Sequence, residues 1–84
     1  MKSMINKPTL DMHGMDQEYG RLAVLEFISD NIKMKNKEIV IVHGVGKGIL
    51  RKMVLDLLRK HKDVLEYHMD FYNPGSTNVK LKID

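Results

Sequence analysis

Residues 39–51 read Ile-Val-Ile-Val-His-Gly-Val-Gly-Lys-Gly-Ile-Leu-Arg, and the rest of the chain is arranged around this stretch. Its first four residues are apolar and β-branched, which is typical of a strand buried on both faces. Glycines alternate with Val45 and Lys47 after His43, and a helical pattern of apolar residues begins at Ile49. The stretch therefore predicts a buried strand that leads into a helix through a glycine-rich turn.

Such a turn gathers backbone N–H groups at the N-terminus of the helix, where the positive end of the helix dipole also favours anions. Glycine permits positive φ and lets a ligand approach these N–H groups without a Cβ atom in the way. We expect phosphate as the anion. The residues expected to bind it are Gly44, Gly46, Lys47, Gly48, Arg51 and Lys52.

Two common phosphate loops do not fit this spacing. A Walker loop needs Ser or Thr after its lysine, whereas Gly48 follows Lys47 here. A dinucleotide fingerprint needs Gly-x-Gly-x-x-Gly and an acidic residue at the end of the next strand, but Asp63 precedes that strand. A tight turn without any ligand stays open as an alternative. His43 and the basic start of the helix favour a functional role.

Length and composition restrict the class of protein. The chain has 84 residues and no cysteine, which predicts one small domain and excludes disulfides and Cys/His zinc sites. No apolar run approaches the ~20 residues of a membrane span, and the N-terminus lacks the apolar core of a signal peptide. We therefore expect a soluble, cytoplasmic protein without membrane contact, a monomer by default.

The positive charge is concentrated in the second half of the chain. Residues 1–42 carry six Lys/Arg and six Asp/Glu, whereas residues 43–84 carry eight and five, so this half holds the whole net charge of +3. Because the glycine-rich turn lies in the same half, the distribution favours a polyanionic partner.

The hydrophobic periodicity predicts a flexible N-terminal segment over residues 1–8 and one domain over residues 9–84. Within the domain we expect strands at residues 9–12, 39–42, 64–71 and 77–83, and helices from residue 16 to about 33 and from residue 49 to about 61. In the third strand, Leu65, Tyr67, Met69 and Phe71 alternate onto one face, and Tyr67, Phe71 and Tyr72 are assigned to core and rim packing.

The order βαβαββ is typical of a two-layer α/β (α+β) sandwich with both helices on one face of a four-stranded mixed sheet. Right-handed crossovers make strands 1 and 2 parallel neighbours, and strand 4 lies antiparallel, either outside strand 3 or between strands 2 and 3. Asp11-Met12-His13-Gly14 and His43-Gly44 then meet at the carboxyl ends of strands 1 and 2. Open α/β sheets bind ligands at such an edge, so we expect both histidines to face one shared pocket.

With these segments side by side, the chain resembles the Smr (small MutS-related) domain family. The family's first motif is represented by Leu10-Asp11-Met12-His13-Gly14, its second by residues 43–51, and Gly75-Ser76-Thr77-Asn78-Val79 is similar to the stretch that opens its last strand. The resemblance implies the strand order 1-2-4-3, as does a likeness to the C-terminal domain of bacterial translation initiation factor three. His13, where MutS-like members often have Arg, implies a stand-alone Smr protein.

The resemblance also implies binding of DNA or RNA and a nicking endonuclease activity. Cleaving a phosphodiester needs a base, an acid and donors for the developing charge, and Asp11, His13 and His43 are the candidate catalytic residues. They could also ligate a divalent metal, although the sequence does not require one. The alternative is a noncatalytic nucleic-acid-binding module in which the histidines shape the loops. The paired histidines favour the nuclease.

Overall fold

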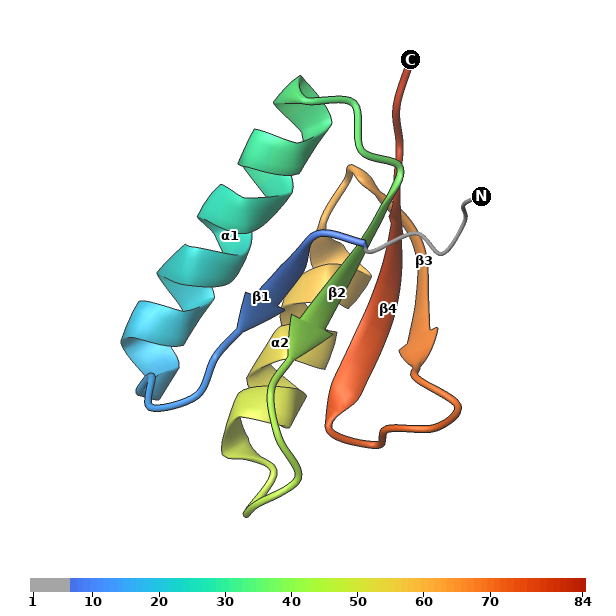
Figure 1. The fold of residues 1–84 in the computed structure, drawn as a ribbon. Coiled ribbons are helices and arrows are strands. Elements are labelled where there is room, and N and C mark those ends of the chain that lie inside the picture. Colours follow the sequence, from blue (N-terminus) through green and yellow to red (C-terminus); the bar gives the residue numbers. More distant parts are fainter. Residues whose placement is uncertain (1–6) are drawn as a thin grey trace.

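The structure is a computed structural model that describes residues 7–84, and most of the segment expected over residues 1–8 therefore lies outside the described residues. The elements alternate as βαβαββ (Figure 1). They are β1 (Thr9–Asp11), α1 (Gln17–Lys33), β2 (Glu38–Val42), α2 (Ile49–Lys60), β3 (Val64–Met69) and β4 (Ser76–Leu81). The predicted elements are all present, with ends that differ by a few residues.

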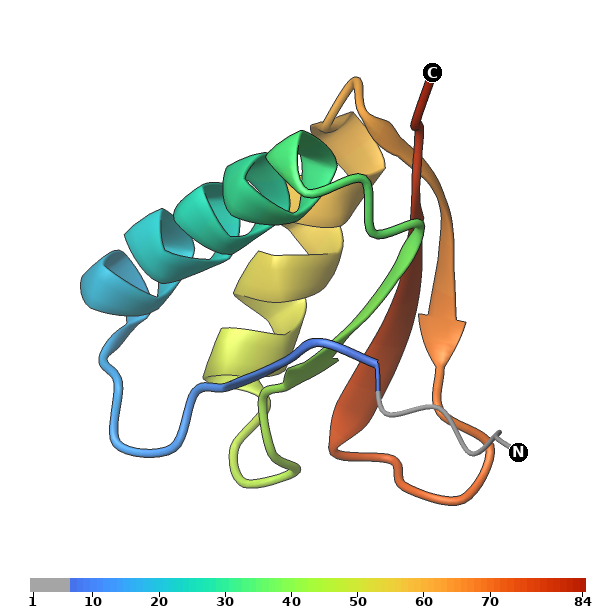
Figure 2. The ribbon, with the colours of Figure 1, turned by 45° about the horizontal axis from the view of Figure 1, so that its top comes forward.

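The four strands form one mixed sheet in the order β1-β2-β4-β3. β1 and β2 are parallel neighbours, and β4 is antiparallel to both β2 and β3. Both helices lie on one face of the sheet, so the molecule has two layers (Figures 1 and 2). The fold class and the order 1-2-4-3 are confirmed, and the alternative with strand 4 outside strand 3 is wrong.

The N-terminal end of α1 is fixed by a side-chain cap and by close packing. Asp16 Oδ1 accepts a hydrogen bond of 2.8 Å from the backbone N–H of Tyr19, which satisfies one of the unpaired donors of the first turn. Gly20 is buried, and a Cβ atom there would lie 2.7 Å from Cε of Met12. The glycine costs helix stability, about 1 kcal/mol relative to Ala, but it lets α1 pack close to the segment that follows β1.

The core lies between the helices and one face of the sheet. In β2, Ile39 and Ile41 are fully buried against the helices, whereas Val40 and Val42 are half-buried on the opposite face. The expectation that this strand is buried on both faces therefore holds for its helix-facing side only. The buried apolar residues are Met12, Val24, Ile28, Ile39, Ile41, Met53, Val54, Leu58, Val79 and Leu81.

The third strand differs from its predicted alternation. A register shift between Val64 and Glu66 makes Leu65 the extra residue of a β-bulge, so Val64 and Tyr67 both pack against the core while Leu65 is exposed. A bulge reverses the facing of the residues that precede it, which a strict period of two cannot anticipate.

β3 also ends earlier than expected. Its last residue is Met69, so Phe71 and Tyr72 lie in the loop that joins β3 to β4, and both are exposed. Their assignment to core and rim packing is wrong, because the hairpin loop turns away from the core at this point.

Within residues 7–84, none of the helices is long and apolar enough to cross a membrane. The cytoplasmic location, the monomeric state and the domain boundary at residue 9 stay predictions.

Candidate functional site

The carboxyl ends of β1 and β2 lie side by side, as the topology requires. Asp11 is paired with Val42 across the two strands, and the backbone N–H of Met12 donates to the carbonyl of Val42 at 2.9 Å. Three loops lie at this end of the molecule, over residues 12–16, 43–48 and 70–75 (Figures 1 and 2). The two sequence motifs and the hairpin loop therefore share one edge.

His43 is the side chain at the centre of this edge. It directly follows β2, is 8% exposed, and is bonded to Thr77, the residue that pairs with the buried Ile41. Its Nε2 lies 2.7 Å from the hydroxyl Oγ1 of Thr77, and its Nδ1 lies 3.0 Å from the carbonyl oxygen of Gly44. A carbonyl can only accept, so Nδ1 donates to Gly44, while Nε2 and the Thr77 hydroxyl form the second hydrogen bond. Both ring nitrogens thus have protein partners.

Thr77 is a functional partner that the sequence did not indicate. It lies in β4 and is 1% exposed. Its hydroxyl is hydrogen-bonded to His43, which lies 34 positions earlier in the chain. No local sequence pattern indicates a pair so far apart. The Gly75-to-Val79 stretch, on which the family resemblance partly rests, is the signal that could have pointed to it.

Gly75 brings the hairpin loop against the glycine-rich turn. Its carbonyl accepts hydrogen bonds of 2.9 Å from the backbone N–H groups of both His43 and Gly44. A Cβ atom at Gly75 would lie 3.2 Å from the Cα atom of Gly44, which is closer than ordinary packing allows. The Gly44 amide is consequently occupied by the protein itself, whereas it was expected to bind phosphate.

The glycine loop, defined as residues 44–48, borders a hollow of about 330 Å³. Among residues 7–84, the backbone N–H groups of Gly46, Lys47 and Gly48 have no hydrogen-bond partner. Gly48 has φ 83° and forms the N-cap of α2, whose first turn contains no acidic residue. The hollow is lined by Met15, Asp16, Gln17, His43, Gly44, Gly46, Lys47, Gly48, Ile49, Leu50 and Arg51.

The charges around the hollow favour an anion. Lys47 and Arg51 contribute positive side chains, and the N-terminus of α2 contributes the positive end of a helix dipole. Asp16 is the acidic residue of the lining, and its carboxylate is engaged in capping α1. Lys52 lies outside this hollow and lines, together with Arg51, a neighbouring depression of about 270 Å³.

Asp11 and His13 are placed differently from His43. Both are exposed, and Asp11 Oδ1 accepts a hydrogen bond of 3.0 Å from the backbone N–H of His13. Because Asp11 is paired with Val42, it shares the sheet face opposite to the one that carries His43. Neither Asp11 nor His13 lines the hollow. The two histidines, which were expected to face one shared pocket, therefore do not line this hollow together.

The three predicted catalytic side chains also do not form a metal centre. Within the part of the chain that the structure describes, no three His, Asp or Glu side chains converge in an arrangement that could hold a metal ion.

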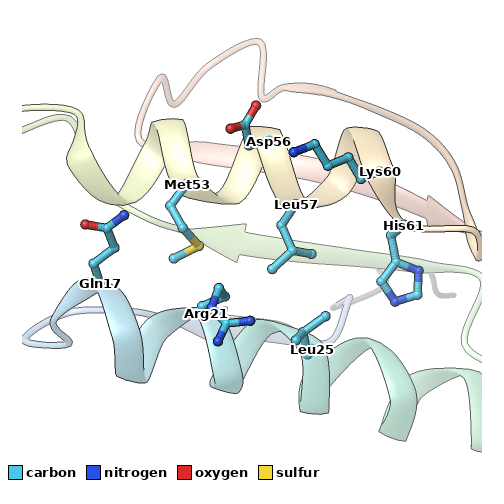
Figure 3. A pocket seen from close by; sticks show the side chains of 8 residues that line it. All are labelled: Gln17, Arg21, Leu25, Met53, Asp56, Leu57, Lys60 and His61. Atoms are coloured by element: carbon cyan, nitrogen blue, oxygen red, sulfur yellow. The ribbon is translucent and has the colours of Figure 1, made fainter.

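A second hollow, of about 440 Å³, lies between α1 and α2 (Figure 3). Leu25, Met53 and Leu57 point into the space between the two helices, and Arg21 and Lys60 belong to its rim. Gln17 lines both hollows, so this groove begins beside the glycine loop and continues along the helices. The complete lining is Gln17, Arg21, Leu25, Met53, Asp56, Leu57, Lys60 and His61.

The sheet order, the two helices on one face and the glycine loop at the start of α2 define a two-layer α/β domain with exposed N–H donors at a helix N-terminus. A profile of the Smr domain matches residues 10–82, so the chain belongs to the Smr domain family. The family predicted from the two motifs is thereby confirmed.

Relatives of known sequence support this membership. The chain is 34% identical over 76 residues to "Endonuclease MutS2" of Clostridium perfringens, covering 90% of this chain and 10% of the relative. It is 35% identical over 73 residues to "Endonuclease MutS2" of Clostridium botulinum, covering 87% of this chain and 9% of the relative. The chain thus spans about a tenth of the length of these relatives.

Two solved structures share the fold. The Smr domain of Thermus thermophilus MutS2 superposes with a TM-score of 0.86 at 23% identity, covering 88% of this chain and 96% of that one. YdaL, a stand-alone small MutS-related protein from Escherichia coli, also gives a TM-score of 0.86 at 23% identity, covering 93% of this chain and 66% of that one.

Proposed function

We propose that this Smr domain binds DNA or RNA by holding the phosphodiester backbone at the glycine loop. The observation that carries the proposal is the hollow at the N-terminus of α2, where the N–H groups of Gly46, Lys47 and Gly48 lie without a partner from residues 7–84. Arg51, one turn into the helix, adds a side chain that can contact the next phosphate.

Phosphate contacts of this kind supply affinity without reading sequence. Each contact releases condensed counterions, so the affinity falls with salt at a slope of about −0.9 per neutralised phosphate on duplex DNA and about −0.7 on single strands. The net charge of +3, all of it in residues 43–84, agrees with a polyanionic ligand.

Fluorescence anisotropy with labelled oligonucleotides at several salt concentrations tests this binding. Lys47→Ala combined with Arg51→Ala should weaken binding by about tenfold or more and lower the salt slope by about 1 to 2. Lys33→Ala combined with Lys62→Ala removes the same charge from exposed positions outside the glycine loop and serves as the matched control. Equal losses for both pairs would show that only the overall charge matters.

Phosphodiester cleavage is the second candidate function, and the relatives named "Endonuclease MutS2" favour it. In such a step water adds to phosphorus, a base takes its proton, the bond to one ester oxygen breaks, and an acid supplies a proton to that oxygen. Asp11 and His13 are the exposed candidates for these two roles, and they lie at the edge beside the glycine loop.

His43 has a different role in this second candidate. Both ring nitrogens already have protein partners, Nδ1 the Gly44 carbonyl and Nε2 the Thr77 hydroxyl, so neither is free to contact a substrate directly. We propose that His43 positions the glycine loop, so that His43→Ala weakens binding and stability as well as any cleavage.

Supercoiled plasmid and a structured RNA, incubated with the protein in Mg²⁺ and in EDTA, test cleavage. Asp11→Asn keeps an oxygen that can accept from the His13 amide, and His13→Ala changes an exposed side chain, so both should fold normally. If the wild type cleaves and these variants bind without cleaving, the domain is a nuclease. If the wild type binds but does not cleave, the domain is a binding module and not a nuclease. If both variants cleave as the wild type does, Asp11 and His13 are not the catalytic residues. The proposed binding function is retained in both cases.

A further inference from the structure

Phe71 and Tyr72 form an exposed aromatic pair that the proposed phosphate site does not use. Each is 89% exposed, although aromatic side chains of this size are normally buried. Their ring centroids are 5.0 Å apart and the ring planes meet at 88°. Two adjacent residues thus offer large π faces to the solvent.

The loop that carries the pair is held by its own hydrogen bonds. Asp70 accepts from the backbone N–H of Tyr72 through Oδ2 and from the side chain of Asn78 through Oδ1, both at 3.0 Å. The Gly75 N–H donates to Asn73 Oδ1 at 3.0 Å, and the Asp70 N–H donates to the Ser76 carbonyl at 2.9 Å. A backbone that is already ordered lowers the entropy cost of placing a ligand on the rings.

The same loop contacts the glycine loop directly. Gly75, three residues after Tyr72, accepts from the amides of His43 and Gly44 and packs against Gly44 Cα. Figures 1 and 2 both show the β3–β4 loop and the glycine loop at the same end of the sheet. The loop that carries the aromatic pair thus shares one end of the sheet with the glycine loop, where an extended strand held by its phosphates can reach both.

We propose that Phe71 and Tyr72 stack on unpaired bases of a strand whose backbone lies on the glycine loop. This inference rests on the proposed nucleic-acid binding and names its substrate class as single-stranded DNA or RNA, or unpaired segments within a structured molecule. Bases inside a duplex are already stacked and do not present a free face, whereas every unpaired base has one.

The test compares probes of equal length that differ in whether free base faces are present. The probes are a labelled oligothymidine of about 12 nucleotides, its duplex with the complementary strand, and an abasic strand of the same length. The variants are Phe71→Ala/Tyr72→Ala and Phe71→Leu/Tyr72→Leu, the second of which keeps apolar bulk but removes the rings. Met34→Ala changes an exposed apolar residue at the C-cap of α1 and serves as the control.

Wild type should bind oligothymidine more tightly than the duplex or the abasic strand. Both double variants should lose about five- to 100-fold in affinity for oligothymidine, as expected for one or two stacked bases, and less than about twofold for the abasic strand. Thermal unfolding should show that both variants remain folded.

Two results would overturn the inference and leave the proposed function intact. One is an affinity for oligothymidine that is the same in the Phe71→Ala/Tyr72→Ala variant as in the wild type. The other is retention of full affinity by the leucine pair, which would indicate a general apolar contact such as a protein partner makes. If the wild type binds none of the three probes, the proposed function itself fails, and this inference fails with it.

Discussion

The Nε2 atom of His43 lies 2.7 Å from the Oγ1 atom of Thr77, and this contact joins the residue that follows β2 to the second residue of β4. Since the Nδ1 atom is bonded to the Gly44 carbonyl, the ring links three backbone segments of the site: β2, the glycine loop and β4. Gly75 adds a second link through its carbonyl. The shape of the glycine loop therefore depends on residues that follow it by about thirty positions.

Thr77→Val should destabilise the domain by about 1–3 kcal/mol, because it leaves the Nε2 atom of the buried His43 without a hydrogen-bond partner. Urea unfolding followed by circular dichroism measures this loss. The same variant should weaken oligonucleotide binding, since the glycine loop loses one of its supports.

Thr9→Val is the matched control for the change of hydroxyl to methyl. Thr9 is exposed on β1, and its Oγ1 donates to the Lys7 carbonyl at 2.9 Å. This substitution should change the free energy of unfolding by no more than about 0.5 kcal/mol. If the two variants lose equal stability, the contact between His43 and Thr77 has no special weight.

Gly75→Ala should destabilise the domain by about 1–3 kcal/mol and reduce binding, because its Cβ would press on the backbone of Gly44 at 3.2 Å. Gly46→Ala meets nothing within 4 Å and should keep the wild-type stability. Because Gly46 lines the hollow, its added methyl group should weaken binding while folding is unchanged. Urea unfolding and fluorescence anisotropy with an oligonucleotide, measured on both variants, check these predictions. A Gly75→Ala variant with wild-type stability and wild-type affinity would contradict them.

Asp70 should make the hairpin loop sensitive to acid. The side chain of Asn78 and the backbone N–H of Tyr72 hold the pKa of Asp70 below its ordinary value. A carboxyl group with a lowered folded-state pKa stabilises the fold above its unfolded pKa, near 4, and this contribution is lost as the pH falls through the folded value. The stability difference between wild type and Asp70→Asn should therefore shrink between about pH 6 and about pH 2.

Asn78→Ala provides the control for this effect. Without its side-chain amide, the largest cause of the lowered pKa of Asp70 is removed. Asp70→Asn, made in that background, should then change stability less at neutral pH and with a weaker pH dependence. A difference between wild type and Asp70→Asn that is constant with pH would show that the carboxylate does not support the loop.

Most of the fold could be predicted from the sequence because its signals are local. The β-branched run at residues 39–42, the capping Asp16 and the turn at residues 73–76 each mark an element in a few consecutive positions. The family resemblance supplied the strand order that periodicity left open. The bulge at Leu65 could not be anticipated, because an extra residue in a strand leaves no mark on the apolar pattern.

The candidate site was less predictable because its geometry is non-local. The motifs indicated the correct edge, but the pleat of the strands placed Asp11 and His43 on opposite faces. The partner of His43 and the contact between Gly75 and Gly44 depend on how the β3–β4 hairpin packs against the residues that follow β2. The exposure of Phe71 and Tyr72 follows from β3 ending at Met69, and strand ends are weakly encoded in sequence.

The most direct test of the phosphate site is an NMR titration of the ¹⁵N-labelled domain with a short oligonucleotide. The largest amide shifts should occur at Gly46, Lys47 and Gly48, whose N–H groups have no partner among the described residues. The Gly44 amide, which already donates to Gly75, should shift less. Shifts that cluster along the groove between α1 and α2 and leave residues 46–48 unchanged would contradict the central claim.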